Sequence, residues 1–262
     1  MAWSRIKGVM LQELYITRRE SALWFDLLVF STISVIVFGL LSQYLTEHSS
    51  SAAATNVILG MLLWEVARVN QYCVSLNSMW NLWSKNLGNI FITPVSTTEY
   101  ITANCLLALL RTVIVFVLIS VAASLIFHFN ILSIGAVTLL LGFTTLSIFA
   151  WAIGWLLLGL VFRYGTSIQA ITWGAFFFFQ PLTAAFFPIS VLPSAFRAIA
   201  YAFPPTYVFE ASRRAVASDG IAWHLFIPAL ILDVLWAAVG VASFVMLFHR
   251  SRVVGQFARN DS

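Results

Sequence analysis

The sequence predicts an all-α polytopic membrane protein. We expect six transmembrane helices, an N-terminal interfacial helix, a short cytoplasmic helix after the second span and an external re-entrant helix pair before the last span. Of the 262 residues, 61% are hydrophobic and 9% are charged, and the mean hydropathy is +0.93. Soluble domains average about 25% charged residues. This composition excludes a soluble enzyme, a disulfide-stapled secreted module and a disordered tail.

Six apolar stretches are separated by polar or proline-containing breaks. A crossing helix needs about 20 apolar residues. Runs such as 112–127 do not alternate with polar residues as barrel strands would, so helices are predicted. The first stretch is longer than the about 7–15 apolar residues of a cleaved signal peptide, and we expect it to be retained. The spans are expected at residues 23–45, 52–80, 100–127, 131–162, 167–187 and 221–248 of a single transmembrane domain, 1–262.

The distribution of Lys and Arg predicts the orientation, because cytoplasmic loops are enriched in them. Six spans place both termini on one side of the membrane. That side carries Arg5, Lys7, Arg18, Arg19, Lys85, Arg163, Arg250, Arg252 and Arg259. The opposite side carries only Arg197, Arg213 and Arg214. Both termini are therefore predicted to be cytoplasmic.

Residues 1–20 are expected to form a helix that lies on the inner leaflet, with tryptophan at headgroup level and basic groups near anionic lipid. The alternative is a positively charged leader that only sets the topology. At helical spacing, one face carries Trp3, Ile6, Met10 and Leu14, and the opposite face carries Arg5, Gln12 and Arg19.

The cytoplasmic loop 81–99 carries a small apolar surface. Leu87, Ile90 and Phe91 have helical spacing, and Thr93-Pro94 ends the helix because the residue before proline avoids the helical region. This short helix would dock in a groove of another protein or pack under its own bundle.

The external segment 188–220 is too polar and too often interrupted by proline to span the membrane. Two short helices broken by proline are tolerated at membrane depth only where protein or water surrounds them. We therefore expect a re-entrant pair that caps the outer end of a pathway.

Glu65 and Arg68 are an intramembrane pair at i and i+3. Charges at the centre of a membrane helix cost about 2.5–3.5 kcal/mol each, so this part of the second span should be enclosed by protein. The pair would form a subunit interface or pathway wall, or would only neutralise itself and lock helix packing.

Aromatic side chains are concentrated at the outer half of the fifth stretch and just beyond it. They would either face lipid as an interfacial belt or line a path suited to sugar rings or acyl chains. The candidate pathway aromatics are Phe176, Phe179, Tyr201 and Phe203.

No motif for chemistry within this chain is found. The four histidines are scattered, and Cys73 and Cys105 lack metal-ligand spacing, so no metal site is predicted. No nucleophile–base arrangement stands out. Lys7 and Lys85 are the only lysines, and neither follows a phosphate-binding glycine loop, so this chain is not expected to bind ATP in that way.

Two motifs make the chain resemble a known family. Ile92-Thr93-Pro94-Val95-Ser96, followed by Glu99, resembles the "TPVS..E" element after the second span of ABC type-2 exporter permeases. The segment 205–213 resembles their "NPLTY..EA.R" signature, although Pro204 stands where the family usually has Asn. Asn86 and Asn89 stand where charged residues are common in the coupling helix.

The resemblance implies the transport subunit of an exporter in the bacterial cytoplasmic membrane. Two copies of the permease would pair with two separate ATPase subunits, which bind ATP and Mg, and nucleic acid has no part. The amphipathic substrate would be a lipid-linked saccharide or polysaccharide, a lipid or a hydrophobic drug. The resemblance also assigns ATPase coupling to Leu87, Ile90, Phe91, Thr93 and Pro94, and the external gate is expected at Pro188, Pro193, Pro205, Tyr207, Glu210 and Arg213.

Two rival functions stay open. A membrane-embedded lipid-modifying enzyme would use Glu65, Arg68 or Glu210, but it lacks a recognisable catalytic constellation. An ion-driven carrier would be built from inverted repeats, but the halves 1–130 and 131–262 show no evident similarity.

Overall fold

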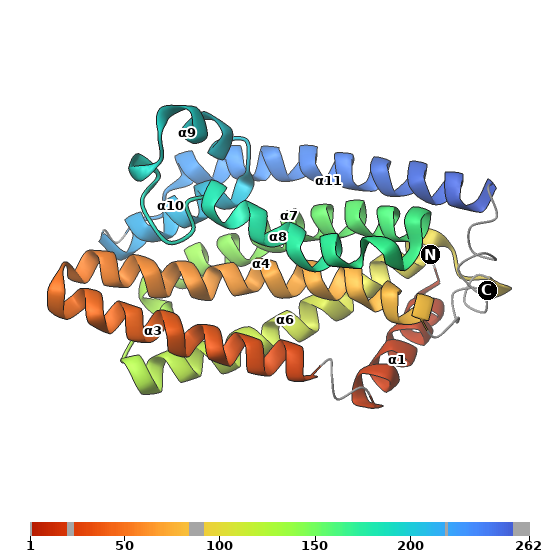
Figure 1. Ribbon diagram of the computed structural model, residues 1–262, viewed down its shortest axis with the longest axis horizontal. Helices are drawn as coiled ribbons and strands as arrows, with labels where there is room; N and C mark the ends of the chain where they lie inside the picture. Colours follow the sequence, from red (N-terminus) through yellow and green to blue (C-terminus); the bar gives the residue numbers. More distant parts are fainter. Residues whose placement is uncertain (1, 20–23, 84–91, 218–219, 254–262) are drawn as a thin grey trace.

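The computed structural model describes residues 2–19, 24–83, 92–217 and 220–253, and within these ranges the chain is helical with no strand. Figure 1 shows a bundle of roughly antiparallel helices. The longer elements are α1 (Trp3–Arg19), α3 (Phe30–His48), α4 (Ser51–Trp83), α6 (Thr97–Phe127), α7 (Ala136–Tyr164), α8 (Gln169–Leu182), α9 (Ser194–Ala200), α10 (Pro204–Ala217) and α11 (Trp223–Val253). A π-helical turn, η1 (Phe25–Val29), leads into α3, and three 3-10 turns are η2 (Ile131–Ile134), η3 (Gly165–Ile168) and η4 (Ile189–Val191).

Five helices in the described ranges are long and apolar enough to cross a membrane. This confirms the all-α, multi-pass membrane class that the composition predicts. The candidate spans are Phe25–His48, Ser51–Ser75, Thr97–Phe127, Ala136–Tyr164 and Trp223–Ser251.

The fifth predicted stretch, 167–187, differs from the expectation. Its helix, α8, has 14 residues, fewer than the about 20 that a full crossing needs. The chain turns directly after Leu182, and Ala184 adopts a left-handed φ of 52°. The apolar stretch 167–187 is therefore longer than the helix that forms within it.

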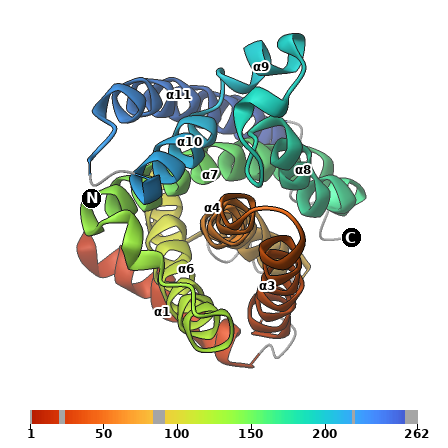
Figure 2. The same ribbon diagram turned by 90° about the vertical axis from the view of Figure 1, so that its left-hand side faces the viewer.

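Helix α4 forms the centre of the bundle. Figure 2 shows it enclosed by α3, α6, α7 and α8. In its most apolar window 78% of the residues are buried, against 22% for the first span and 17% for α11. On the outer faces of α3 and α11, large apolar side chains are exposed, as expected where lipid surrounds them.

Glycines allow two of the tightest helix contacts. A Cβ added to Gly240 on α11 would lie 2.4 Å from the carbonyl oxygen of Ala152 on α7. A Cβ added to Gly60 on α4 would lie 2.0 Å from the carbonyl oxygen of Ala185, just after α8. Small residues let backbones approach in membrane bundles, where packing drives association.

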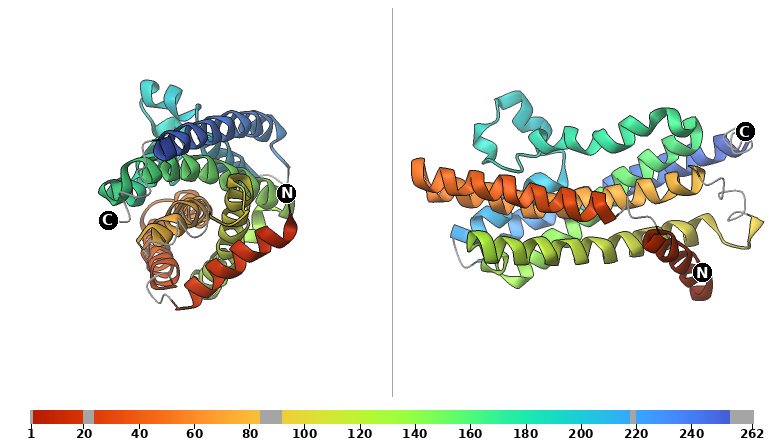
Figure 3. Two further views of the ribbon diagram at one scale, coloured as in Figure 1. Left: turned by 90° about the vertical axis from the view of Figure 1, so that its right-hand side faces the viewer. Right: turned by 60° about the horizontal axis from the view of Figure 1, so that its bottom comes forward.

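Helix α1 lies across one end of α6 (Figure 3). Its buried positions are Ile6, Val9, Glu13 and Thr17. This differs in part from the predicted apolar face, because Trp3 is 57% exposed and Leu14 is 38% exposed. The helix thus has a face packed on protein and a separate exposed apolar face.

Candidate functional site

A buried polar cluster joins α3 to α4. Arg68 donates hydrogen bonds from Nε and Nη2 to the two Glu65 oxygens, at 2.9 and 2.6 Å. Ser31 on α3 donates to Glu65 at 2.7 Å and accepts from Arg68 at 2.9 Å. Arg68 is 7% exposed and Glu65 3%. The i,i+3 spacing that predicted this pair produces a bidentate ion pair, and Ser31 locks it to the first span.

A second polar contact lies one helical turn away. The Tyr72 hydroxyl on α4 donates a hydrogen bond to Oδ2 of Asp26 in η1. Both side chains are half-buried. A π-helical turn is rare, and such turns occur frequently at functional sites.

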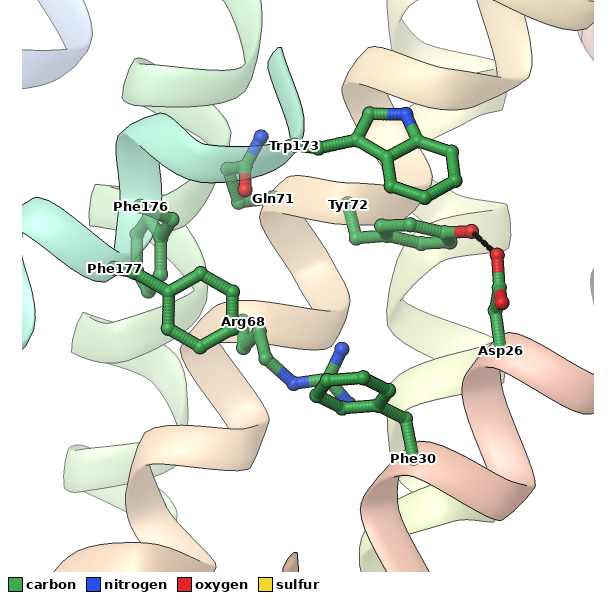
Figure 4. Close-up of a pocket in the computed structure, with 8 residues that line it drawn as sticks. All are labelled: Asp26, Phe30, Arg68, Gln71, Tyr72, Trp173, Phe176 and Phe177. Atoms are coloured by element: carbon green, nitrogen blue, oxygen red, sulfur yellow. Dashed lines mark hydrogen bonds between the residues drawn. The ribbon is translucent and has the colours of Figure 1, made fainter. Parts of the chain in front are cut away.

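Asp26, Arg68 and Tyr72 line a pocket of about 90 Å³, which we call the α3–α8 pocket (Figure 4). It lies between η1 and α3 on one side and α8 on the other, over α4. Its lining is mainly aromatic, with one carboxylate, one guanidinium, one amide and one phenol. The lining residues are Asp26, Phe30, Arg68, Gln71, Tyr72, Trp173, Phe176 and Phe177.

Three of the predicted pathway aromatics lie inside the protein. Phe176, Phe179 and Phe203 are buried or half-buried and pack against Phe149 at centroid distances of 6.4, 5.7 and 6.2 Å. Of these three, Phe176 also lines the α3–α8 pocket. Tyr201 lies apart, 43% exposed, and packs against Tyr207 at 5.6 Å.

The residues of the "EA.R" motif hold the turn at the end of α8. Arg213 donates from Nη1 to Glu210 at 3.1 Å and from Nη2 to the carbonyl oxygens of Ala184 and Ala185. Burial lowers the pKa of the Arg213 guanidinium, and the Glu210 carboxylate opposes that effect. Arg213 thus supplies donors to two carbonyls that the left-handed turn at Ala184 leaves outside the helix.

The neighbouring motif residues fasten α9 to α10. Thr206 donates to the Ala200 carbonyl at 2.6 Å, and Tyr207 donates to the Tyr201 carbonyl at 3.0 Å. Pro205 lies in the first turn of α10, where the missing N–H costs no hydrogen bond. Pro188 precedes η4 and Pro193 precedes α9. The predicted gate residues therefore form one cap at the end of the bundle opposite α1 (Figure 1).

The "TPVS..E" element forms the start of α6. Ser96 caps the helix by accepting from the Glu99 N–H, and Glu99 accepts from the Ser96 N–H at 3.0 Å, a reciprocal capping box. The other Glu99 oxygen accepts from the Ala2 N–H at 2.8 Å, and Arg5 donates to the Pro94 carbonyl at 2.8 Å. Thr93 and Pro94 precede this cap, whereas Leu87, Ile90 and Phe91 lie outside the described residues.

Sequence reasoning missed two further polar residues. Arg111 on α6 is buried and donates a hydrogen bond to Thr17 on α1. Asp233 on α11 is 1% exposed, and neither carboxylate oxygen has a hydrogen-bond partner among the described residues. Intramembrane charge was the only signal in the sequence for these two residues, and Thr17 lies 94 positions from Arg111. No group of three or more His, Cys, Asp or Glu that could hold a metal ion occurs in the described ranges.

Comparison with known proteins supports the motif resemblance. The chain matches the family model described as "ABC-2 type transporter" over residues 6–216. No curated protein matches the chain. The matched range includes the α3–α8 pocket, the capping box and the Arg213 cap. The chain therefore belongs to the ABC-2 type transporter family, and it is a membrane transport subunit of an ABC transporter, not an enzyme.

Proposed function

We propose that this chain is the permease of an ATP-driven exporter. Two copies pair with two separate ATPase subunits, which bind ATP and Mg, in the bacterial cytoplasmic membrane. The complex moves an amphipathic substrate out of the cytoplasm or the inner leaflet. The family membership supports the permease role, because ABC-2 permeases generally work with an ABC ATPase.

The direction of the helices supports a six-pass topology with both termini cytoplasmic. Figure 1 shows α7 and α11 running the same way along the bundle, so the chain must return between them. Helix α8, extended at its start by η3, makes that return and ends at the α9–α10 cap. On this reading α8 is a short sixth pass and the cap is a re-entrant outer gate.

The observation that carries the proposal is the connection of α6 to α1 at Glu99. The loop 81–99 leads directly into the capping box, and Glu99 also binds the start of α1. Arg111 fastens the other end of α1 to the same helix. A movement of the loop would therefore move α1 and α6 together, as expected if an ATPase grips the loop through Leu87, Ile90 and Phe91.

The geometry favours transport over the rival lipid-modifying enzyme. Glu65 and Arg68 neutralise each other, and Glu210 is engaged by Arg213. Groups held in ion pairs are poor general acids or bases, because a partner already holds each charge. The α1 face with Trp3, Lys7 and Leu14 suits the inner leaflet, with basic groups near anionic lipid.

The experiment is reconstitution of the permease in liposomes with the ABC ATPase subunit that copurifies with it. We expect ATP hydrolysis to depend on the permease, and Phe91→Asp or Leu87→Asp to reduce that hydrolysis at least tenfold, since a charge would have to enter an apolar groove. Val253→Asp, at an exposed apolar residue near the end of α11, is the matched control and should leave hydrolysis unchanged.

Two results would contradict the proposal. If ATP hydrolysis is unchanged in both Phe91→Asp and Leu87→Asp, the loop 81–99 is not the surface that couples the permease to the ATPase. Turnover or uphill transport by the purified permease alone, with no ATPase present, would favour an enzyme or an ion-driven carrier.

A further inference from the structure

The α3–α8 pocket and its rim carry more negative than positive charge. Among the described residues that line it, the charged groups are the carboxylates of Asp26 and Glu65 and the guanidinium of Arg68. Glu65 accepts two hydrogen bonds from Arg68, so this pair is neutral as a unit. Among the described residues, no Lys, Arg or His lies within 4.0 Å of Asp26. The uncompensated charge is therefore the Asp26 carboxylate.

One face of the Arg68 guanidinium is also covered by an aromatic ring. Its Cζ lies 5.4 Å from the centroid of the Phe30 ring. Figure 4 shows the Phe30 ring overlying the guanidinium, whereas Asp26 meets the Tyr72 hydroxyl. The guanidinium also donates from Nε and Nη2 to Glu65, so two of its three nitrogens are already engaged. Arg68 is thus poorly placed to bind an anion.

Aromatic rings surround the exposed part of the pocket. Phe30 is 55% exposed, Trp173 46% and Phe177 42%, and Trp173 packs edge-on to Tyr72 at 6.3 Å. Ring faces attract organic cations, and clusters of rings bind quaternary ammonium groups. Aromatic rings beside a single uncompensated carboxylate are therefore suited to a cation that carries apolar substituents.

We infer that the α3–α8 pocket binds the ammonium head of an amphipathic organic cation as part of the transport path. This inference rests on the proposed function, and it narrows the substrate class. A saccharide linked to lipid through phosphate would bring negative charge to Asp26, and Arg68, which already donates to Glu65, would not offset it. An ammonium group would be held by Asp26 and the rings, and its apolar body would lie along Phe176 and Phe177.

Two kinds of molecule carry such an ammonium group: a free cationic amphiphile, and a membrane lipid with a choline head. The test uses the permease–ATPase complex in phosphatidylglycerol nanodiscs, with radiolabelled dodecyltrimethylammonium as the probe. We expect saturable binding that neutral dodecyl maltoside does not displace. Displacement by added phosphatidylcholine would assign the pocket to a lipid head, and lack of displacement would assign it to the free amphiphile.

Two variants test the pocket itself. Asp26→Asn keeps the shape but removes the charge, and should weaken probe binding at least tenfold. Trp173→Leu removes a ring that is 46% exposed, and should weaken binding severalfold. Asp233→Asn is the matched control, because it removes an intramembrane carboxylate from α11, outside the pocket, and should leave binding unchanged.

The results separate this inference from the proposed function. Unsaturable probe binding, or full binding by both Asp26→Asn and Trp173→Leu, would overturn the cation site even if ATP hydrolysis still depends on the permease. ATP hydrolysis that does not depend on the permease would overturn the proposed function, whether or not the probe binds.

Discussion

The carbonyl oxygen of Ala185 occupies the space in which Gly60 would carry a side chain. A Cβ at Gly60 would lie 2.0 Å from that oxygen and 2.9 Å from the Ala185 carbon. The same oxygen accepts a hydrogen bond from Arg213 at 2.9 Å. The central helix α4, the turn after α8 and the cap helix α10 therefore meet at one peptide group.

Substituting Gly60→Ala should loosen this junction. The added methyl group would clash with the Ala185 carbonyl, which is backbone and is held by Arg213. A change of side-chain rotamer cannot relieve this clash, so the turn itself has to move, at a cost of about 1–3 kcal/mol. We expect a lower melting temperature of the purified permease and faster proteolysis of segment 183–193. Gly174→Ala on α8, where a Cβ meets nothing within 4 Å, is the matched control and should be neutral or slightly stabilising. A Gly60→Ala variant with the melting temperature and proteolysis rate of the wild type would contradict this account of the junction.

Arg213→Gln should release the cap from the turn. The Arg213 side chain is 9% exposed, and it satisfies two backbone carbonyls and Glu210. Hydrogen bonds from charged donors are worth about 1.5–3 kcal/mol each, so the loss of unfolding free energy should exceed about 1.5 kcal/mol. Chemical denaturation in detergent measures it. Arg214→Gln, at the adjacent exposed arginine that contacts His224 at 2.8 Å, should cost less than about 1 kcal/mol. Equal effects of the two substitutions would argue against a special role for Arg213.

The sequence predicted helices where apolar content alone decides the structure. The long spans lie close to their expected ranges, and the Glu65–Arg68 pair follows from spacing on one helix. The shortness of α8 did not follow from composition, because a turn at Ala184 interrupts a stretch that is still apolar. Asp26 and Tyr72 are 46 positions apart, so only the packing of η1 on α4 brings them together. The buried face of α1 includes Glu13 and Thr17, which share the helical face of Ile6 but are polar, so hydrophobicity alone did not mark them as buried.

Two substitutions at Glu65 and Arg68 should separate a packing role from a transport role. Glu65→Gln leaves a buried guanidinium without its counter-charge and should cost about 3–5 kcal/mol of stability. The double variant Glu65→Leu, Arg68→Met removes both charges together, and its stability should lie within about 1 kcal/mol of the wild type. Thermal unfolding of these two variants, compared with the wild type, checks this. If the stable double variant also keeps full permease-dependent ATP hydrolysis and transport, the pair only locks α3 to α4 through Ser31.

Glu99→Gln should free the start of α1 without unfolding the bundle. The Glu99 carboxylate accepts from the Ala2 and Ser96 N–H groups with different oxygens, and Arg5 lies 3.6 Å away. An amide has one acceptor oxygen, so one N–H loses its partner and the attraction to Arg5 is lost. Losing a capping interaction costs about 1 kcal/mol, so hydrogen exchange of the amides at Ile6 and Val9 should accelerate about fivefold. Thr102→Val removes an exposed bond within α6 and should leave that exchange unchanged. Unaltered exchange in Glu99→Gln would show that the packing of Ile6 and Val9 alone holds α1, and ATPase-driven movement of the loop would then need another route to that helix.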